Sequence, residues 1–551
     1  MPRAMRIASA AVLLLLVWLV LYPILFVVVD SLRGPAGLTS AHYVRFAASA
    51  TELRALWNSV WISALSVFFS ALIGVPLAFL FARFDFFGRR FLAGLAALPV
   101  LLPPLVGVIA FLFLYGETGF LTRSIQLLLG LEDPPWRLQG AFAVLLVHAY
   151  TMYVYFYLFT AAALARLDPA QMDAAAALGA GTWTRLRRVT LPLLAPALTG
   201  ASLLVFMTSM ASFSAPYVFG GGFRVLTTQI YASKLNGEAS MVAVETVVLA
   251  LASMLFLLLL NRYEAGREYT GAGKGIGATQ RLSPSRSHRI AASIAAAVLV
   301  LFLIMPHLTV LLVSFVPEGS WTTELFPPAY SAANYVELFA SAEQLRPVIN
   351  SLRMSAIATV ANVVLAFGAA YLLARRAGRA RGAISLLVAL PWALPGTVLA
   401  IALATTFSTS QWWLGRFVLV GTGIILPLAY FIRNVPLVTR AALTSFRQFD
   451  PALEEAAASL GAPWLTTARR VILPLVLPGL LAGALLAFVT ALGEFVASIL
   501  LYTHSTRPIS IEILAQLRGY DFGGAAAYGV LLIVLMALAF LVGRRYGDGT
   551  V

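Results

Sequence analysis

Long apolar segments alternate with short polar segments along the whole chain, and each apolar segment is about as long as a membrane-spanning helix. A span needs about 20 mostly apolar residues. Six segments of this kind lie in the first half, near residues 8–30, 57–82, 91–115, 139–163, 196–220 and 241–261. Six more lie in the second half, near residues 289–315, 350–374, 382–408, 417–438, 477–502 and 524–543. The pattern predicts an all-α integral membrane protein with about 12 transmembrane helices.

The composition supports this prediction. The chain has 551 residues, of which 60% are hydrophobic and only 11% are charged, whereas soluble proteins carry about 25% charged residues. The first apolar segment is longer than a signal-peptide core of about 7–15 residues, and no clear cleavage site follows it, so we interpret it as a retained span. The chain has no cysteine, which excludes disulfides, thiolate metal sites and cysteine nucleophiles.

The distribution of charge predicts the orientation. The net charge is +15, and the arginines stand in short clusters between apolar segments. With the N-terminus inside, the inside segments carry most of these clusters, whereas the outside loops carry acids such as Glu117 and Asp521. We therefore expect a multi-pass protein of the cytoplasmic (inner) membrane with both termini in the cytoplasm. The basic balance then reflects contact with the lipid bilayer, and no nucleic-acid partner is expected.

The chain contains an internal duplication. MDAAAALGAGTWTRLRRVTLPLLAPA at 172–197 and EEAAASLGAPWLTTARRVILPLVLPG at 454–479 align at an offset of 282. An even number of spans in each half gives both halves the same orientation, so the repeat is parallel and the substrate path is expected at the repeat interface. We predict a first membrane domain at 1–261, a flexible cytoplasmic linker rich in Gly, Ser and Arg at 262–288, and a second membrane domain at 289–551.

The repeated segment reads as a polar helical loop between the fourth and fifth spans. Asp168 is expected to cap a helix whose first residue is Pro169, and Gly179 fits its C-terminal end. Thr182 is expected to cap a second short helix, after which Leu191-Pro192 leads back into the membrane. One alternative is an amphipathic loop that rests on lipid headgroups. Two copies with unchanged spacing favour a protein partner, because lipid contact requires no fixed spacing.

The spacing within the loop resembles a known family. An acid and two alanines are followed by three residues, a Gly, nine residues, an aliphatic residue, one residue and Leu-Pro. This resembles the signature loop of the permeases of binding-protein-dependent ABC importers. The second copy matches fully and the first has Asp in place of Glu. The matching residues are Asp173, Ala174, Ala175, Gly179, Leu191 and Pro192 in the first copy, and Glu455, Ala456, Ala457, Gly461, Leu473 and Pro474 in the second.

The resemblance implies that each loop is a coupling helix that docks on one of two copies of a separate cytoplasmic ATPase. An extracytoplasmic solute-binding protein would deliver the solute, and one half would rock against the other. The chain itself is then not an enzyme and binds no cofactor, because ATP and magnesium are used by the partner subunit. The sequence agrees, since GAGKGIGAT at 271–279 does not have the spacing of a phosphate-binding loop.

The substrate is less well defined by the sequence. Fusion of two permease halves in one chain resembles the ferric-iron and thiamine permeases, and MASFSAPYVFGGGFRVLTTQIY at 210–231 looks like the iron-type group. We favour ferric iron, and thiamine, phosphonate and polyamine remain alternatives.

Polar residues inside spans are costly and often functional. Glu494 is the best candidate for a substrate-path residue, and its repeat partner is Ser212. Glu245 is expected near the outer interface, and Arg433 lies either in the bundle interior or near the cytoplasmic end of its span. His148 stands among tyrosines, and both residue types are possible iron ligands. A hydrogen-bonded packing role of His148 is the stronger interpretation.

Two other classes of protein fit the sequence less well. An ion-coupled secondary transporter would place buried acids for proton or sodium coupling, yet the few acids in these spans do not repeat between the halves. A membrane-embedded enzyme would need a cluster of catalytic or metal-ligating residues, and the five histidines are scattered. Only an ABC importer permease explains the two repeated loops, and no metal site is predicted in this chain.

Overall fold

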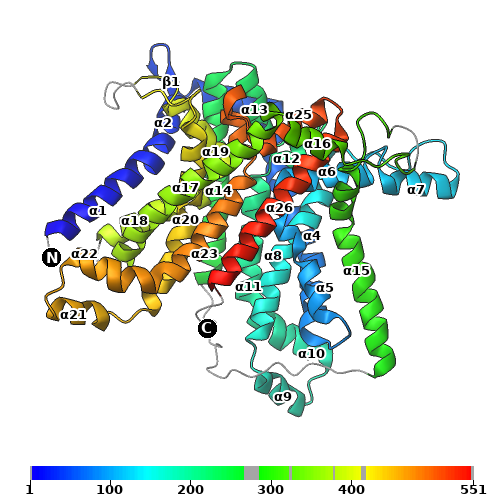
Figure 1. Ribbon diagram of the computed structural model, residues 1–551, viewed down its shortest axis with the longest axis horizontal. Coiled ribbons are helices and arrows are strands. Elements are labelled where there is room, and N and C mark those ends of the chain that lie inside the picture. The colour runs from blue at the N-terminus through cyan, green and yellow to red at the C-terminus, as the bar shows by residue number, and fades with distance from the viewer. Residues whose placement is uncertain (1–2, 266–284, 322–324, 376–378, 411–416, 548–551) are drawn as a thin grey trace.

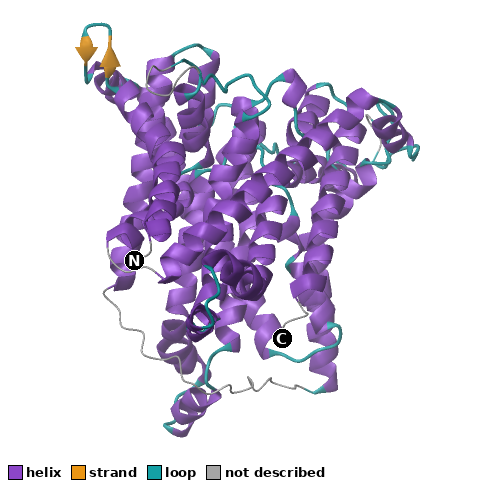
Figure 2. Ribbon diagram, turned by 60° about the vertical axis from the view of Figure 1, so that its left-hand side comes forward, coloured by secondary structure: helices purple, strands orange, loops and turns teal. Residues whose placement is uncertain are grey.

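The computed structural model describes residues 3–265, 285–321, 325–375, 379–410 and 417–547. These residues form a bundle of helices with one short antiparallel ribbon, β1 (Arg33–Gly34) and β2 (Gly37–Leu38), at one end (Figures 1 and 2). In this part of the chain, ten helices are long and apolar enough to cross a membrane, or eleven if one bent pair is counted as a single span. The predicted all-α membrane architecture is therefore confirmed.

The two halves have matching elements. The first half contains α1 (Arg3–Leu16), η1 (Val17–Leu21), α2 (Tyr22–Ser31), α3 (Ala41–Ala48), α4 (Ala50–Arg83), α5 (Arg89–Ala96), η2 (Leu98–Leu101), α6 (Pro104–Tyr115), α7 (Phe120–Leu129), α8 (Gly140–Ala165), α9 (Pro169–Ala177), α10 (Thr182–Arg185), η3 (Leu186–Thr190), α11 (Leu191–Met210), α12 (Ser214–Phe219), α13 (Leu226–Leu235) and α14 (Ala239–Ala265). The second half contains α15 (Arg286–Val313), α16 (Ala333–Ala340), α17 (Ala342–Arg375), α18 (Arg379–Ala393), α19 (Gly396–Thr406), α20 (Ile425–Gln448), α21 (Ala452–Ser459), α22 (Trp464–Thr467), η4 (Ala468–Ile472), α23 (Leu473–Leu492), α24 (Val496–Leu501), η5 (His504–Thr506), α25 (Ile509–Arg518) and α26 (Phe522–Gly547). The duplication is close: α4 and α17 each have 34 residues, and α11 and α23 each have 20.

Two predicted spans in each half are not continuous helices. The third span of the second half is the bent pair α18 and α19, which turns by 107° at Leu394-Pro395. The matching span of the first half breaks at Leu102-Pro103, because proline has no amide hydrogen to continue the helix. The fifth span breaks between α11 and α12 and again between α23 and α24. The expected span at 417–438 is α20, which begins later and is less apolar because it carries three arginines.

The boundary between the halves falls partly outside the described residues. Helix α14 ends at Ala265 and α15 begins at Arg286, so helix extends into both ends of the linker predicted at 262–288. Residues 266–284 of that linker lie outside the part of the chain that the structure describes.

Each half is built around three helices that pack closely on one another. In the first half α11 packs on α4 and α8, and in the second half α23 packs on α17 and α20. Small residues permit the close approach, as usual between membrane helices. At Gly74 of α4, for example, a Cβ atom would overlap the backbone of Tyr153 in α8. The buried serines Ser59, Ser63 and Ser66 lie on the same face of α4.

The first helix of each half crosses to the other half. Helix α1 packs on α17 and α18 of the second half, whereas α15 packs on α5 and α6 of the first half as well as on α26 of its own half (Figure 1). Helices α9 and α21, with α10 and α22, protrude at one end of the bundle, which we call the motif face. The opposite end, which carries α13 and α25, is called the far face. The start of α1 and the end of α26 both lie toward the motif face.

Candidate functional site

The two motif loops begin and end their helices in the same way. Asp168 Oδ1 accepts a hydrogen bond from the Ala170 amide at 2.9 Å, and Asp450 Oδ1 accepts one from the Ala452 amide at the same distance. These caps satisfy amide groups that the first helical turn leaves free. The predicted Asp168 cap is therefore confirmed, and Asp450 repeats it.

Both helices end at a glycine with left-handed backbone geometry. The φ angle is +77° at Gly179 and +75° at Gly461. In the first loop the Ala180 amide bonds to the Ala175 carbonyl, and the Gly179 amide bonds to the Ala176 carbonyl. The second loop repeats both bonds. This pair of bonds terminates a helix and needs a residue that tolerates positive φ, which explains the glycine.

The second part of each loop differs from the prediction. Thr182 is the first residue of α10 rather than its cap, and its predecessor Gly181 takes the capping position without a side-chain bond. Leu191-Pro192 leads into the membrane span as expected, but the second helix is not a separate short one. It runs through a π-helical turn directly into α11, and the Leu191 amide bonds to the Leu186 carbonyl five residues back. The wider turn accommodates Pro192, which has no amide hydrogen, and η4 does the same before Pro474.

The helices of the two motif loops, α9 and α21, are exposed on the motif face, and most of their side chains are small. No residue of α9 or α21 is buried. Leu178 is 89% exposed and Leu460, at the same position of the repeat, is 88% exposed. Trp183 and its counterpart Leu465 are exposed as well. An exposed leucine beside a helix of alanines is suited to contact another protein, because it leaves a large apolar side chain in water. The remaining motif residues lie in the same two loops: Asp173, Ala174, Ala175, Glu455, Ala456 and Ala457 on α9 and α21, and Leu191, Pro192, Leu473 and Pro474 where α11 and α23 begin.

The second loop is tied to its own half, and the first is not tied in the same way. Arg375, the last residue of α17, pairs with Glu454 at 2.8 Å, and both side chains are mostly buried. The Tyr371 hydroxyl also contacts Glu454, at 3.4 Å. In the first repeat Met172 stands at the position of Glu454, and no carboxylate among the described residues pairs with Arg83, the counterpart of Arg375. The ion pair therefore belongs to one loop only.

The two predicted path residues lie at equivalent breaks in the fifth spans. Ser212 lies between α11 and α12, and its hydroxyl bonds to His148 Nε2 of α8 at 2.9 Å. Ser66 and Ser209 contact the other ring nitrogen of His148 at 2.9 and 3.2 Å. The predicted packing role of this histidine fits these contacts, since the ring is fully buried among hydroxyls.

Glu494 lies at the corresponding break between α23 and α24. Its Oε2 atom pairs with Arg433 Nε of α20 at 3.0 Å, and its Oε1 atom accepts the Ala497 amide at 3.0 Å. Arg433 therefore points into the bundle interior, one of the two positions that the sequence left open. Its guanidinium lies against Gly396, where a Cβ atom would overlap it, at the bend between α18 and α19. The pair thus connects α20 with the break between α23 and α24 and with the bend before α19.

The two breaks meet at the centre of the molecule. Phe213 and Phe495 follow Ser212 and Glu494 directly, and their ring centroids are 5.9 Å apart. Both rings are 1% exposed. Gly493 lies beside Pro103, so the break in the third span of the first half also reaches this point. No pattern in the sequence indicated that these two phenylalanines would touch.

Glu245 lies in the second turn of α14, beside α13 at the far face, and its predicted place near the outer interface stays a prediction. It is fully buried and accepts a hydrogen bond from Ser233 at 2.6 Å. Glu52 is also buried and accepts from Gln229 at 2.8 Å. In the described part of the chain, no three His, Asp or Glu side chains are grouped so as to hold a metal ion.

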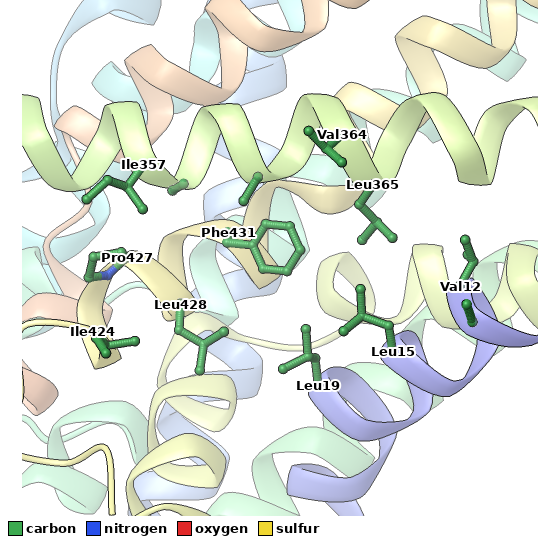
Figure 3. A pocket seen from close by; sticks show the side chains of 13 residues that line it. Val12, Leu15, Leu19, Ile357, Val364, Leu365, Ile424, Pro427, Leu428 and Phe431 are labelled. Carbon is green, nitrogen blue, oxygen red and sulfur yellow. The ribbon is translucent and has the colours of Figure 1, made fainter. Parts of the chain in front are cut away.

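A large groove in the structure is apolar. It has a volume of about 600 Å³ and lies between α1, η1, α17 and α20, where side chains such as Leu15, Leu19, Val364 and Phe431 line it (Figure 3). It offers no charged or hydrogen-bonding side chain to hold a polar solute. The path for such a solute is better placed at the polar breaks than in this groove.

Comparison with known proteins agrees with this geometry. Residues 74–269 and 362–548 match the family described as "binding-protein-dependent transport system inner membrane component", once in each half. A probable ABC transporter permease of Sinorhizobium fredii is 30% identical over 490 residues, which cover 89% of this chain and 86% of that protein. The ferric transport system permease FbpB of Actinobacillus pleuropneumoniae is 26% identical and covers 98% of this chain and 78% of its own length. The spermidine/putrescine permease PotB of Escherichia coli is 29% identical over 44% of this chain and 92% of its own length. The chain therefore belongs to the family of inner membrane components of binding-protein-dependent transport systems, and it is an ABC importer permease that carries both halves of the membrane domain.

Proposed function

We propose that this permease imports ferric iron, which a solute-binding protein delivers to the far face and which leaves at the motif face into the cytoplasm. The observation that carries the proposal is the likeness to a ferric permease over 98% of this chain, with both halves in one polypeptide. The polyamine permease, by comparison, matches only 44% of the chain.

The motif loops are the docking points for two copies of a separate ATPase. Support comes from their capped helices, the exposed Leu178 and Leu460, and the equivalent glycines at their ends. In this proposal ATP-driven closure of the partner moves the two loops together. The halves then rock about the contact between Phe213 and Phe495, and the path opens on one face and then on the other.

Uptake of radiolabelled ferric iron tests the substrate. Iron-starved cells that lack this chain are compared with cells in which it is restored, with labelled thiamine and spermidine measured in parallel. Restored iron uptake that is lost again with Glu455→Lys supports both the substrate and the coupling. If the chain restores spermidine or thiamine uptake instead, iron is the wrong substrate and the permease assignment is unaffected.

A further inference from the structure

A second cavity, of about 410 Å³, opens at the far face of the second half. The loop from Tyr502 to Arg507 forms one wall, and one face of α25, from Ile511 to Arg518, forms the other. Unlike the apolar groove, this cavity has arginine, histidine, tyrosine and threonine side chains beside the apolar Ile511, Leu514 and Ala515. Its chemistry therefore suits a polar ligand rather than a lipid chain.

The cavity carries more positive than negative charge. Arg507 pairs with Glu512 at 2.7 Å, so its charge is compensated within the wall. Arg518 has no carboxylate partner among the described residues, and its guanidinium lies 5.6 Å from the ring centroid of Tyr217 in the other half. The Lys234 ammonium also reaches across from the first half and donates a hydrogen bond to the Leu500 carbonyl of the second half. The Arg518 side chain is exposed, so an anion from outside the chain can reach its guanidinium.

This arrangement occurs in one repeat only. The first half has Leu235 at the position of Arg518 and Gly221 at the position of His504. Arg224 matches Arg507, but its guanidinium bonds to the neutral side chain of Gln229. The single copy shows that the shared fold does not require these residues. They are therefore free to serve the solute, which passes along one path.

We infer that this cavity binds an oxyanion group, a carboxylate or a phosphate, of the solute that enters at the far face. Arginine suits such a group because its planar fork of donors matches two oxygens. The inference rests on the proposed import of iron in one respect: the iron would enter as a complex with anionic oxygen ligands, because a bare trivalent cation would be repelled.

A chain of contacts connects the cavity to the central contact. Arg518 lies over Tyr217, Tyr217 stacks on Phe213 at 5.1 Å, and Phe213 meets Phe495 at 5.9 Å. An oxyanion bound to Arg518 would therefore be linked to the central contact through the ring of Tyr217.

Titration calorimetry on the purified full-length chain in lipid nanodiscs tests the site, with citrate and inorganic phosphate as separate probes. We expect saturable binding of at least one probe, and about tenfold weaker binding after Arg518→Gln, since bonds to a charged donor contribute strongly. Arg45→Gln is the matched control. It removes the same charge from the far face. Arg45 does not line the cavity, and its guanidinium pairs with Glu238 at 2.7 Å. This control should bind as the wild type does.

The outcomes separate this inference from the proposed substrate. If neither anion binds the wild type, or if Arg518→Gln and Arg45→Gln weaken binding equally, the cavity is not an oxyanion site, whatever iron uptake shows. If Arg518→Gln lowers uptake but leaves both titrations unchanged, the cavity contacts another protein and the inference is overturned. If the anions bind through Arg518 while the chain supports no iron uptake, the site stands and iron is the wrong solute.

Discussion

Phe213 and Phe495 occupy the same position in the two repeats, and their rings touch, with centroids 5.9 Å apart at an interplanar angle of 52°. A residue can contact its own repeat counterpart only near the axis that relates the repeats. Because parallel repeats place the substrate path at their interface, this contact lies where the path must pass. The residues before them, Ser212 and Glu494, supply polar groups at the same level.

Replacement of both phenylalanines by alanine should leave the path leaky. The variant Phe213→Ala/Phe495→Ala removes the apolar contact at the axis, so we expect ATP-independent efflux of potassium from proteoliposomes that hold the variant. Phe206→Ala is the control, because Phe206 is also buried and stacks on Phe256 within one half. Each Phe→Ala change costs about 3–5 kcal/mol of stability. A leak of equal size in the control would mean that lost stability, and not an opened path, causes the efflux.

The motif loops were predictable because their signals are local. An Asp-Pro cap, a run of alanines and a glycine at the helix end act over one or two turns, so the ends of α9 were correct from sequence. The continuation into α11 was missed. A separate short helix was expected before Leu191-Pro192, whereas a π-helical turn joins that helix to α11 and accommodates the missing amide hydrogen of Pro192.

The centre of the molecule was only partly predictable. Glu494 and Ser212 stood out because polar residues in spans are costly. Their partners, Arg433 and His148, lie more than 60 positions away, and no periodic pattern connects them. The breaks at Leu102-Pro103 and between α11 and α12 were hidden as well, because hydropathy averages over a window and does not register a short non-helical gap.

Gly179→Ala and Gly461→Ala should weaken the docking of the ATPase. At φ near +75° an alanine costs about 1–2 kcal/mol, so the end of the helix unwinds and displaces the exposed leucine beside it. Gly181→Ala is the matched control in the same loop: its φ is −62°, and a Cβ atom added there would meet nothing within 4 Å. Co-purification of the ATPase with each variant measures the effect. Equal retention by Gly179→Ala and Gly181→Ala would show that the helix end does not matter for docking.

The Arg375–Glu454 pair predicts that the two loops respond differently to charge reversal. Glu454→Arg leaves two cations in a mostly buried place, so we expect lower ATPase stimulation and weaker uptake. The exchange Arg375→Glu/Glu454→Arg should restore much of both activities, because the opposite charges face each other again. In the first repeat Met172→Ala should have a smaller effect than Glu454→Arg, since no ion pair is lost there. Failure of the exchanged pair to recover would assign Glu454 a direct contact with the ATPase.

The Arg433–Glu494 pair allows stability and transport to be separated. Arg433→Met alone leaves the 6% exposed Glu494 carboxylate without its cation, and the loss is about 3 kcal/mol or more. Glu494→Gln alone leaves the arginine without its acid and should destabilise the protein for the same reason. The double variant Arg433→Met/Glu494→Gln removes both charges, so its thermal unfolding temperature should recover most of the way to that of the wild type. Iron uptake should remain absent in the double variant if Glu494 contacts the solute. The reverse result, normal uptake once the fold is restored, would make the pair a structural brace between α20 and the break before α24 and would remove Glu494 from the path.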